Sequence, residues 1–349
     1  MTSSPRTLVT GATGLVGSEL VHQLLSEGVA VRIFRRETSN LTLLGTAAER
    51  VEHAVGDVRD ARSLLDAMDG VDTVYHAAAK VSFGPGQQDA LHAINVKGTG
   101  NVVNAALRSH VRRLVHTSSM AAFGRPALRA PARSGASVSP VAPVINEDTG
   151  WKGDENRSAY ALSKYEAELE VHRGIAEGID AVIVNPSLIF GVGREGHNTR
   201  RIVDLVRSGW ARAVPPGSTN VVDVRDVVTG MRRAMADGET GRRYFLGSEN
   251  VSWNGLVSTL AVAFDEDPPS CTLPPQLLRV AAWVSEAVSM ITRQEARLTR
   301  EQIRTSTSEH RYSNERARTE LGCEFRPFAA TAVWLADELR DVTKAKKTR

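Results

Sequence analysis

Short apolar runs alternate with stretches of helical periodicity through the first half of this chain. The runs are only a few residues long, and in the stretches between them apolar residues recur at intervals of three or four. Such alternation predicts a parallel sheet with helices on both faces, right-handed crossovers, and ligands at the carboxyl ends of the strands. The predicted strands are 8–9, 29–34, 51–55, 73–76, 114–116, 181–184, 221–224 and 244–246.

Helices are predicted between these strands and over most of the last hundred residues. Asp60 and Asp226 stand directly before helical patterns at 61–68 and 227–236, so both are candidate N-caps. The stretch 125–144 is rich in proline, alanine, arginine and serine without apolar periodicity, and we expect it to be a loop.

The first predicted strand ends in a glycine-rich turn. Gly11, Gly14 and Gly17 follow one another at intervals of three, and a helix is predicted directly after them at 18–27. Glycine lets the backbone approach a pyrophosphate, and the free N–H groups at the start of a helix bind phosphate oxygens. The turn is therefore a candidate dinucleotide site. The alternative is that these glycines only allow the backbone to bend steeply between strand and helix.

Two arginines, Arg35 and Arg36, follow the second predicted strand, about twenty residues beyond the glycine turn. In a dinucleotide-binding fold an acidic residue at this place holds the ribose hydroxyls of NAD, whereas a basic residue accommodates the 2′-phosphate of NADP. The pair contains no carboxylate and favours NADP, with NAD possible, unless both arginines are only surface charge. Asp57, after the third strand, could contact the adenine amino group or merely cap a turn.

Small and polar residues follow the next two strands. Ala77, Ala78 and Ala79 come after the strand at 73–76 and would let the chain pass close to a bound nucleotide, although tight core packing would explain them equally well. The strand at 114–116 runs into Thr117, Ser118 and Ser119, which places hydroxyl groups at the edge of the sheet where ligands bind.

Tyr160 and Lys164 lie four residues apart, on one face of the helix predicted at 158–177. An ordinary tyrosine, with a pKa of about 10, exchanges protons poorly at neutral pH, but a nearby cation lowers that pKa. We expect Lys164 to supply the cation, Ser119 to hold a substrate carbonyl, and Tyr160 to give or take the proton. This spacing also occurs by chance on surface helices, but its place after the glycine turn and the serine-bearing strand end favours catalysis.

Together these motifs resemble the extended short-chain dehydrogenase/reductase superfamily. The similar segments are 10–17, 56–57, 76–79, 95–99, 117–119, 160–164 and 185–187, in the order that the superfamily has them. Segments 116–119, 185–187, 222–227 and 244–247 are most similar to the dihydroflavonol reductase-like group, which neighbours the NAD-dependent epimerase/dehydratases. The resemblance covers roughly residues 7 to 250.

The resemblance implies a Rossmann-type α/β fold and a Ser/Tyr/Lys site. It implies that Tyr160 is the acid–base group, that Lys164 orients the nicotinamide ribose and tunes Tyr160, and that Ser119 polarises the carbonyl. Ser119 is preferred to Ser118 because the family's catalytic hydroxyl stands five residues before the glycine that is Gly124 here. The candidate cofactor contacts are Gly11, Thr13, Gly14, Leu15, Val16, Gly17, Arg35, Arg36, Asp57, Val58, Ala77, Ala78, Ala79, Asn95, Thr117, Tyr160, Lys164, Pro186 and Ser187.

Composition excludes several classes of protein. The 349 residues carry a net charge of +3 and only two cysteines, so neither a disulfide framework nor a metal site is expected, and a reducing, cytoplasmic location fits best. The first strand begins too early to leave room for a secretion signal. The apolar stretch 277–291 is interrupted by Arg279 and Glu286 and is too short to span a membrane, which favours a core or pocket-wall helix. Nucleic-acid binding is unsupported because the positive charge is dispersed, apart from a basic tail.

We expect two lobes and a tail. The NAD(P)-binding Rossmann lobe comprises residues 1–190 with 221–250, and a smaller, mostly helical substrate lobe comprises 191–220 and 251–340. Residues 341–349 form the basic tail. The expected partner is a small-molecule carbonyl or alcohol, and a homodimer is possible.

Three functions are compatible with these motifs. The favoured one is an NADP-preferring oxidoreductase that reduces a carbonyl of a moderately large substrate or oxidises the matching alcohol. The second is an NAD-dependent nucleotide-sugar epimerase or dehydratase, in which arginines between Arg194 and Arg212 would clamp a diphosphate. The third, a non-catalytic dinucleotide-sensing regulator, would not need Tyr160 and Lys164, so their presence counts against it.

Overall fold

The computed structural model describes residues 6–84, 86–124, 143–151, 158–196, 198–292 and 299–347. In these ranges the main sheet has seven parallel strands in the order β11-β7-β5-β4-β1-β2-β3. They are β1 Arg6–Thr10, β2 Ala30–Arg35, β3 Glu52–Val55, β4 Thr73–His76, β5 Arg113–Thr117, β7 Ala181–Pro186 and β11 Arg243–Leu246. The order reverses between β1 and β4, so the predicted doubly wound Rossmann-type fold is confirmed.

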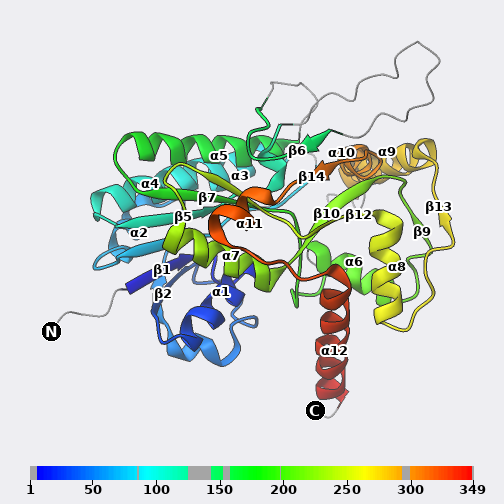
Figure 1. The fold of residues 1–349 in the computed structure, drawn as a ribbon, viewed down its shortest axis with the longest axis horizontal. Coiled ribbons are helices and arrows are strands. Elements are labelled where there is room, and N and C mark those ends of the chain that lie inside the picture. The colour runs from blue at the N-terminus through cyan, green and yellow to red at the C-terminus, as the bar shows by residue number, and fades with distance from the viewer. Residues whose placement is uncertain are drawn as a thin grey trace.

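Helices cover both faces of this sheet (Figure 1). The helical elements between its strands are α1 Leu15–Ser26, η1 Gly45–Arg50, α2 Ala61–Ala67, α3 Gln88–Leu91, η2 His92–Lys97, α4 Gly98–Arg108, η3 Met120–Ala122, α5 Ala159–Ala176 and α7 Val224–Asp237. Because side chains alternate along a strand, Val9 of β1 packs with α1 and α7, whereas Leu8 packs with α2, α4 and α5 on the other face. Both faces of the sheet are therefore buried by helices, and the candidate site lies at its edge.

Helix capping follows the sequence prediction with one correction. Asp60 caps α2, and its carboxylate accepts a hydrogen bond from the N–H two residues later at 3.0 Å. The prediction that Asp226 is an N-cap is wrong, because α7 begins earlier, at Val224, and is capped by Asp223. Asp226 then lies in the first turn, where it accepts a bond from the backbone N–H of Arg326 at 2.7 Å.

The remaining elements form a second group, on the right in Figure 1. Its strands are β8 Leu188–Phe190, β9 Ala213–Val214, β10 Ser218–Asp223, β12 Glu249–Ser252 and β13 Cys271–Thr272, and its helices are α6 Asn198–Arg207, α8 Trp253–Ala263, α9 Pro275–Thr292, α10 Arg300–Ser306 and α12 Phe328–Lys347. β10 is found where a strand was predicted, but it pairs with β8 and β12 in a separate sheet. A buried cluster that includes Phe190, Leu256, Leu260 and Leu335 holds this group together.

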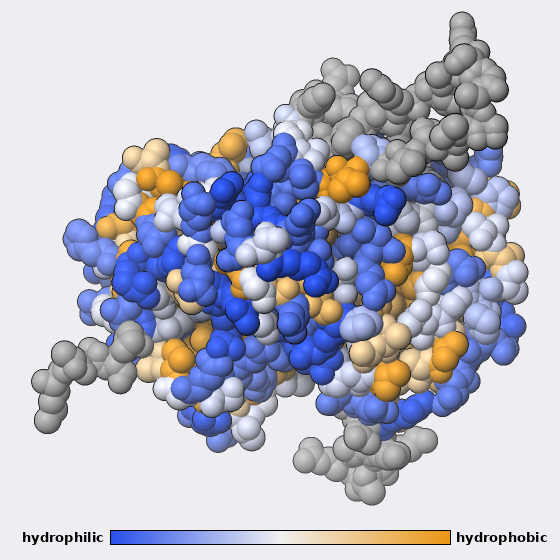
Figure 2. All heavy atoms as spheres, in the orientation of Figure 1, coloured by the Kyte–Doolittle hydropathy of each residue, from blue (hydrophilic) through white to orange (hydrophobic). Residues whose placement is uncertain are grey.

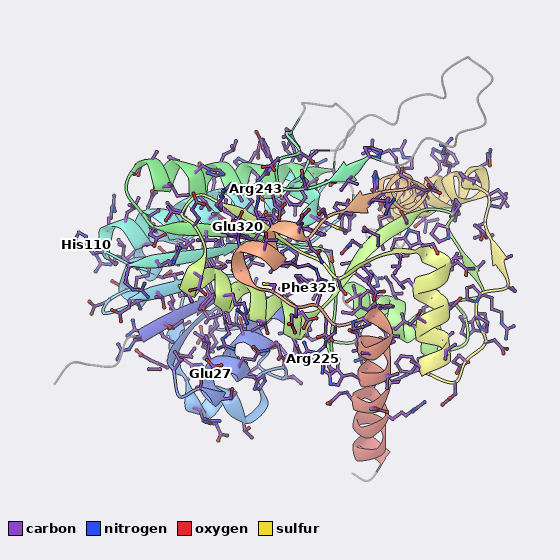
Figure 3. All side chains as sticks on the ribbon, in the orientation of Figure 1. Glu27, His110, Arg225, Arg243, Glu320 and Phe325 are labelled. Atoms are coloured by element: carbon purple, nitrogen blue, oxygen red, sulfur yellow. The ribbon has the colours of Figure 1, made fainter. Side chains whose placement is uncertain are left out.

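Two elements tie the end of the chain back to the main sheet. α11 Glu315–Leu321 places Ala317 and Leu321 in the same core as α1 and α7. Arg225 of α7, labelled in Figure 3, stacks on the ring of Trp334 in α12, with 3.8 Å from the guanidinium carbon to the ring centroid. The predicted division into two lobes stays a prediction, since the last segment contributes to both groups.

Two further expectations concern the predicted loop at 125–144 and the basic tail. Residues 125–142 of the predicted loop lie outside the described residues, and Val144 begins β6 Val144–Ile145, which pairs with β14 Arg311–Tyr312. The backbone of α12 is helical through Lys347, so most of the expected tail continues this helix.

Helix α9 only partly fits the predicted core helix. Leu278 and Ala282 pack with Ile303, while the opposite side is exposed. The exposed large apolar residues of α9 are Leu277, Val280, Trp283, Val284 and Val288. Within the described ranges, no helix has the length and hydropathy needed to cross a membrane. Figure 2 shows that the face turned to the viewer is mostly hydrophilic, with small and separate apolar groups.

Candidate active site

The turn after β1 lies directly against the segment that follows β4. Gly11 has a φ of +70°, and a Cβ atom there would lie 2.5 Å from the backbone nitrogen of Ala78. The backbone N–H of Ala77 donates to the carbonyl of Thr10 at 3.2 Å. Glycine is therefore required at position 11 by its close contact with the backbone after β4, at the switch point of the sheet.

The start of α1 is suited to an anion. Its N-cap is Gly14, no side chain of the described residues caps it, and its first turn holds no acidic residue. A Cβ at Gly17 would lie 2.2 Å from the carbonyl oxygen of Gly11, so the turn packs tightly beneath the helix start. Thr13, Leu15 and Val16 lie in this turn and the first residues of the helix. An uncapped N-terminus in a narrow glycine turn fits the pyrophosphate of a dinucleotide.

A second observation fits the nicotinamide end of such a cofactor. Pro186 ends β7, and the side chain of Ser187 is buried beside it. The hydroxyl oxygen of Ser187 has no hydrogen-bond partner within the described part of the chain. Buried hydroxyls are rarely left unpaired, so a bound ligand at the carboxyl end of β7 would satisfy it.

Arg35 and Arg36 differ in what they contact. The Nε of Arg35 donates to Nδ1 of His53 at 2.8 Å, and its Nη1 donates to the carbonyl of Arg36 at 3.2 Å. Arg36 is exposed and lies close enough to Asp57 for its charge to lower the pKa of that carboxyl, after the stronger effect of Arg59. Arg36 is thus the freer of the two cations, while Arg35 braces the turn after β2.

Asp57 and Val58 lie at the end of β3, where adenine contacts were predicted. The carboxylate of Asp57 accepts bonds from Nε and Nη2 of Arg59 at 2.9 and 2.8 Å. Val58 is buried against Gly98 of α4, where a Cβ would lie 2.9 Å from a Val58 methyl group. Their adenine contacts stay predictions.

Tyr160 and Ser119 meet at the carboxyl end of β5. Their side chains lie close enough together for Ser119 to act on the pKa of Tyr160, and the ring of Tyr160 packs edge-on against Phe83 with 5.4 Å between centroids. Ser119 also accepts a bond from the N–H of Ala121 at 3.2 Å, whereas the neighbouring Ser118 turns away to Glu168. The structure therefore brings together the hydroxyl and the phenol that the motifs predicted as partners.

Lys164 lies one helical turn further along α5 and is 2% exposed. Its ammonium donates to the carbonyl oxygen of Thr117, the last residue of β5, at 2.8 Å. Burial lowers the pKa of Lys164 to about 8, and the carboxylate of Glu168 opposes this shift. The lysine thus couples α5 to the same strand end that carries Ser119.

The expected lowering of the pKa of Tyr160 by Lys164 stays a prediction. The pKa of Tyr160 is raised above its ordinary value because burial disfavours the phenolate, and the hydrogen bond with Ser119 offsets this only in part. Lys164 is not among the causes of this shift. The phenol is therefore protonated at neutral pH.

Asn95 acts within the chain. It lies in the π-helical turn η2, and its amide makes three contacts, with the N–H of Lys80 at 2.7 Å, the carbonyl of Lys80 at 3.0 Å and the hydroxyl of Ser163 at 2.9 Å. It therefore holds the segment after β4 against α5. A direct contact of Asn95 with the cofactor stays a prediction.

Arg194 contacts the glycine turn, and its expected part in a diphosphate clamp stays a prediction. Its Nη2 donates to the carbonyls of Thr13, in the glycine turn, at 2.5 Å and of Asn40 at 2.7 Å, and its Nε is buried without a partner in the described residues. The guanidinium thus spans two segments on the nucleotide side. Only the long-range fold reveals this, because 181 residues separate Arg194 from Thr13.

A buried pair of histidines and a buried glutamate on α5 were not singled out in the sequence. His76 and His116 lie in adjacent strands with their ring centroids 5.2 Å apart and the rings tilted by 37°, and burial lowers the pKa of both, to about 3 for His76. Glu168 is 2% exposed and contacts Ser118 and Asn185. The available signal was its spacing, since Glu168 follows Tyr160 and Lys164 by eight and four residues on one helix face.

Known proteins resemble this chain over most of its length. A sequence profile of the NAD dependent epimerase/dehydratase family matches residues 7–247. The chain is 36% identical over 320 residues to sterol demethylase protein B of Methylococcus capsulatus, covering 90% of this chain and 92% of that protein. It is 33% identical over 328 residues to a Synechocystis protein named "Putative dihydroflavonol 4-reductase", covering 90% and 88%.

Solved structures share the fold. The crystal structure of gox2253 has a TM-score of 0.77 and 33% identity, and the match covers 94% of this chain and 95% of that one. The dTDP-glucose 4,6-dehydratase DesIV from Streptomyces venezuelae, solved with NAD bound, has a TM-score of 0.73 at 20% identity, covering 95% and 97%. These matches confirm the resemblance to extended short-chain dehydrogenases, and the chain belongs to the NAD-dependent epimerase/dehydratase family.

Proposed function

We propose that this protein is an NADP-preferring oxidoreductase that reduces a carbonyl of a moderately large small molecule, or oxidises the matching alcohol. The observation that carries the proposal is that the side chains of Ser119 and Tyr160 come together at the strand end to which the buried Lys164 is bonded. A bound nicotinamide would supply or accept the hydride. Relatives named as reductases, including a 2-alkyl-3-oxoalkanoate reductase from Stenotrophomonas maltophilia, favour net redox chemistry.

The roles of the three side chains follow from their contacts. The hydroxyl of Ser119 would donate to the substrate carbonyl oxygen and so stabilise the negative charge that develops on it. Tyr160, which is protonated at neutral pH, would give that oxygen its proton in the reductive direction. Lys164 would fix the cofactor ribose, and its positive charge would favour the phenolate that forms when Tyr160 gives up its proton.

The preference for NADP rests on the turn after β2. Arg36 is exposed there, and Arg35 braces the same turn through His53. We expect Arg36→Ala to weaken NADPH binding by about tenfold while NADH binding changes little, because only NADPH carries the 2′-phosphate. Fluorescence titration with both cofactors measures this, with Arg62→Ala on the exposed face of α2 as the control. Equal losses for the two cofactors would contradict the preference.

The alternative, an NAD-dependent nucleotide-sugar epimerase or dehydratase, is favoured by the family itself and by the fold of DesIV. The two chemistries differ in their net consumption of cofactor. An epimerase returns the hydride to its substrate and retains NAD, whereas a reductase releases the oxidised cofactor each turnover.

The proposal is tested by incubating the purified protein with NADPH and a panel of ketones, aldehydes and nucleotide sugars. We expect stoichiometric NADPH oxidation with at least one carbonyl compound, together with exchangeable NADP in the purified protein. Tightly retained NAD and conversion of a nucleotide sugar without cofactor consumption would contradict it.

A further inference from the structure

We propose that Glu168 is a positioning residue, which sets Ser119 and Tyr160 in register by fastening α5 to the ends of β5 and β7. The proposal rests on the proposed function for its catalytic meaning, but its structural part can be tested without a substrate. Glu168 lies two turns beyond Tyr160 on α5 and is 2% exposed.

One carboxylate oxygen of Glu168 joins three segments that are distant in the sequence. Its Oε1 accepts a hydrogen bond from the hydroxyl of Ser118 at 2.5 Å and another from the amide nitrogen of Asn185 at 2.6 Å. That same amide nitrogen donates to the carbonyl oxygen of Ser119 at 3.1 Å. A helix, the end of β5 and the end of β7 therefore meet at a single charged acceptor.

Together with Lys164, this carboxylate holds three consecutive residues. Lys164 binds the carbonyl of Thr117, Glu168 binds the hydroxyl of Ser118, and Asn185 links Glu168 to the carbonyl of Ser119. Tyr160 stands on the same helix as Lys164 and Glu168. The distance from its phenol to the hydroxyl of Ser119 is consequently fixed by contacts that touch neither group. Catalytic groups lose rate steeply when such supporting contacts are loosened.

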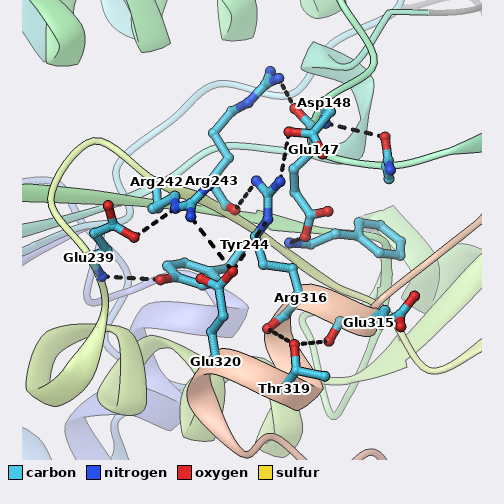
Figure 4. A network of polar contacts seen from close by, with 12 residues as sticks. Glu147, Asp148, Glu239, Arg242, Arg243, Tyr244, Glu315, Arg316, Thr319 and Glu320 are labelled. Atoms are coloured by element: carbon cyan, nitrogen blue, oxygen red, sulfur yellow. Dashed lines mark hydrogen bonds and ion pairs between the residues drawn. The ribbon is translucent and has the colours of Figure 1, made fainter.

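The second carboxylate oxygen of Glu168 faces a positively charged arginine. Nη1 of Arg243 lies 3.4 Å from Oε2 of Glu168, and Arg243 is itself held by the carbonyl of Glu147. Figure 4 shows this outer network, in which Arg243 lies beside Glu147 and Arg316 binds Asp148. Glu168 thus meets one cationic partner and two further donors, which are the contacts that a buried carboxylate needs.

A carboxylate is suited to this position because two donors converge on one of its oxygens. Glutamine keeps the length of the side chain, but it removes the charge and directs an amide NH₂ either at Arg243 or at the donors Ser118 and Asn185. Alanine removes all of these contacts. Ser118→Ala is milder, since it deletes one donor without changing any charge.

The experiment compares Glu168→Gln and Ser118→Ala with Glu170→Gln, whose half-buried carboxylate pairs with Arg173 of the same helix at 2.9 Å. We expect the Kd for NADPH to stay within about twofold while kcat falls about tenfold or more in Glu168→Gln and less in Ser118→Ala. Hydrogen exchange measured by mass spectrometry should accelerate in peptides covering residues 117–119 of these two variants. Peptides from β1 and β2, and the whole of the control, should exchange as in the wild type.

Each contrary result has a distinct meaning. Unchanged exchange at 117–119 with wild-type kcat would overturn the proposal, and so would faster exchange throughout the sheet with a general loss of thermal stability. If the wild type shows no reductase activity, or if Tyr160→Phe is as active as the wild type, the proposed function fails. In that case local exchange at 117–119 alone decides whether Glu168 positions this strand end.

Discussion

Lys164 illustrates how a single buried charge can serve a site at the expense of the fold. The side chain is nearly inaccessible, and burial lowers its pKa to about 8. An unfolded lysine keeps a pKa of about 10.4, so the unfolded chain binds more protons between these two pH values. The stability of the folded protein therefore rises with pH across this window, and the cost of the buried ammonium is fully present below it.

We predict that Lys164→Met is more stable than the wild type at pH 7, by up to on the order of 3 kcal/mol, although it lacks activity. The difference should shrink as the pH rises from about 8 to about 10, where the wild-type lysine becomes neutral. Thermal unfolding at several pH values measures it, with the exposed Lys97→Met as the control. If the variant is less stable than the wild type at pH 7, or if the stability difference does not change with pH, burial of the Lys164 ammonium does not destabilise the fold.

At the scale of the elements, local patterns predicted most of what positions the site. The strand predicted at 73–76 matches β4, the other strands of the main sheet agree within two residues, and α5 agrees with the helix predicted at 158–177 within one residue at each end. What the patterns could not predict depends on residues far apart in the chain. The raised pKa of Tyr160 reflects burial by several elements, and the bonds of Glu168 join segments that only the fold brings together.

The same limit explains the errors in the second half. β10 has the composition of any buried strand, and nothing local shows that it pairs with β8 and β12 and not with β7. Short pieces such as β6 and β14 are only two residues each and carry no periodic signal. Asp226 stands three residues after Asp223, and either could have begun the helix.

The glycine turn gives an element-scale prediction with an internal control. Gly11 and Gly28 have nearly the same backbone conformation, with φ of +70° and +76°. A Cβ at Gly11 would collide with Ala77 and Ala78, whereas a Cβ at Gly28 meets no described heavy atom within 4 Å. We expect Gly28→Ala to cost about 1–2 kcal/mol from backbone strain alone.

Gly11→Ala should cost more than Gly28→Ala by at least about 2 kcal/mol and should abolish NADPH binding, because the backbone after β4 must move. Urea unfolding and cofactor titration of the two variants provide the comparison. Equal stability losses in both would show that the close contact with β4 is unimportant.

At the scale of the whole molecule, the second group of elements reaches back over the nucleotide side through Arg194. This residue follows β8, yet its guanidinium bonds the carbonyls of Thr13 and Asn40, in the turns after β1 and β2. An arginine beside an uncapped helix N-terminus adds positive charge where a pyrophosphate would lie. Cofactor binding should therefore depend on a residue from outside the first half of the chain.

We predict that Arg194→Ala raises the Kd for both NADPH and NADH by about tenfold, since both carry the pyrophosphate. Arg201→Ala, an exposed arginine of α6, should leave both values unchanged. Calorimetric titration distinguishes the two variants. A loss restricted to NADPH would instead assign Arg194 to the 2′-phosphate, and no loss would remove it from the cofactor site.

The central claim is that the phenol of Tyr160, held against Ser119, transfers the proton. The most direct measurement is the single-turnover rate of NADPH oxidation by Tyr160→Phe with a carbonyl substrate, after NADPH binding has been shown to be intact. We predict a rate about 10² to 10⁴ times below that of the wild type, with Tyr165→Phe on the same helix unaffected. A Tyr160→Phe enzyme that turns over at the wild-type rate would contradict the account.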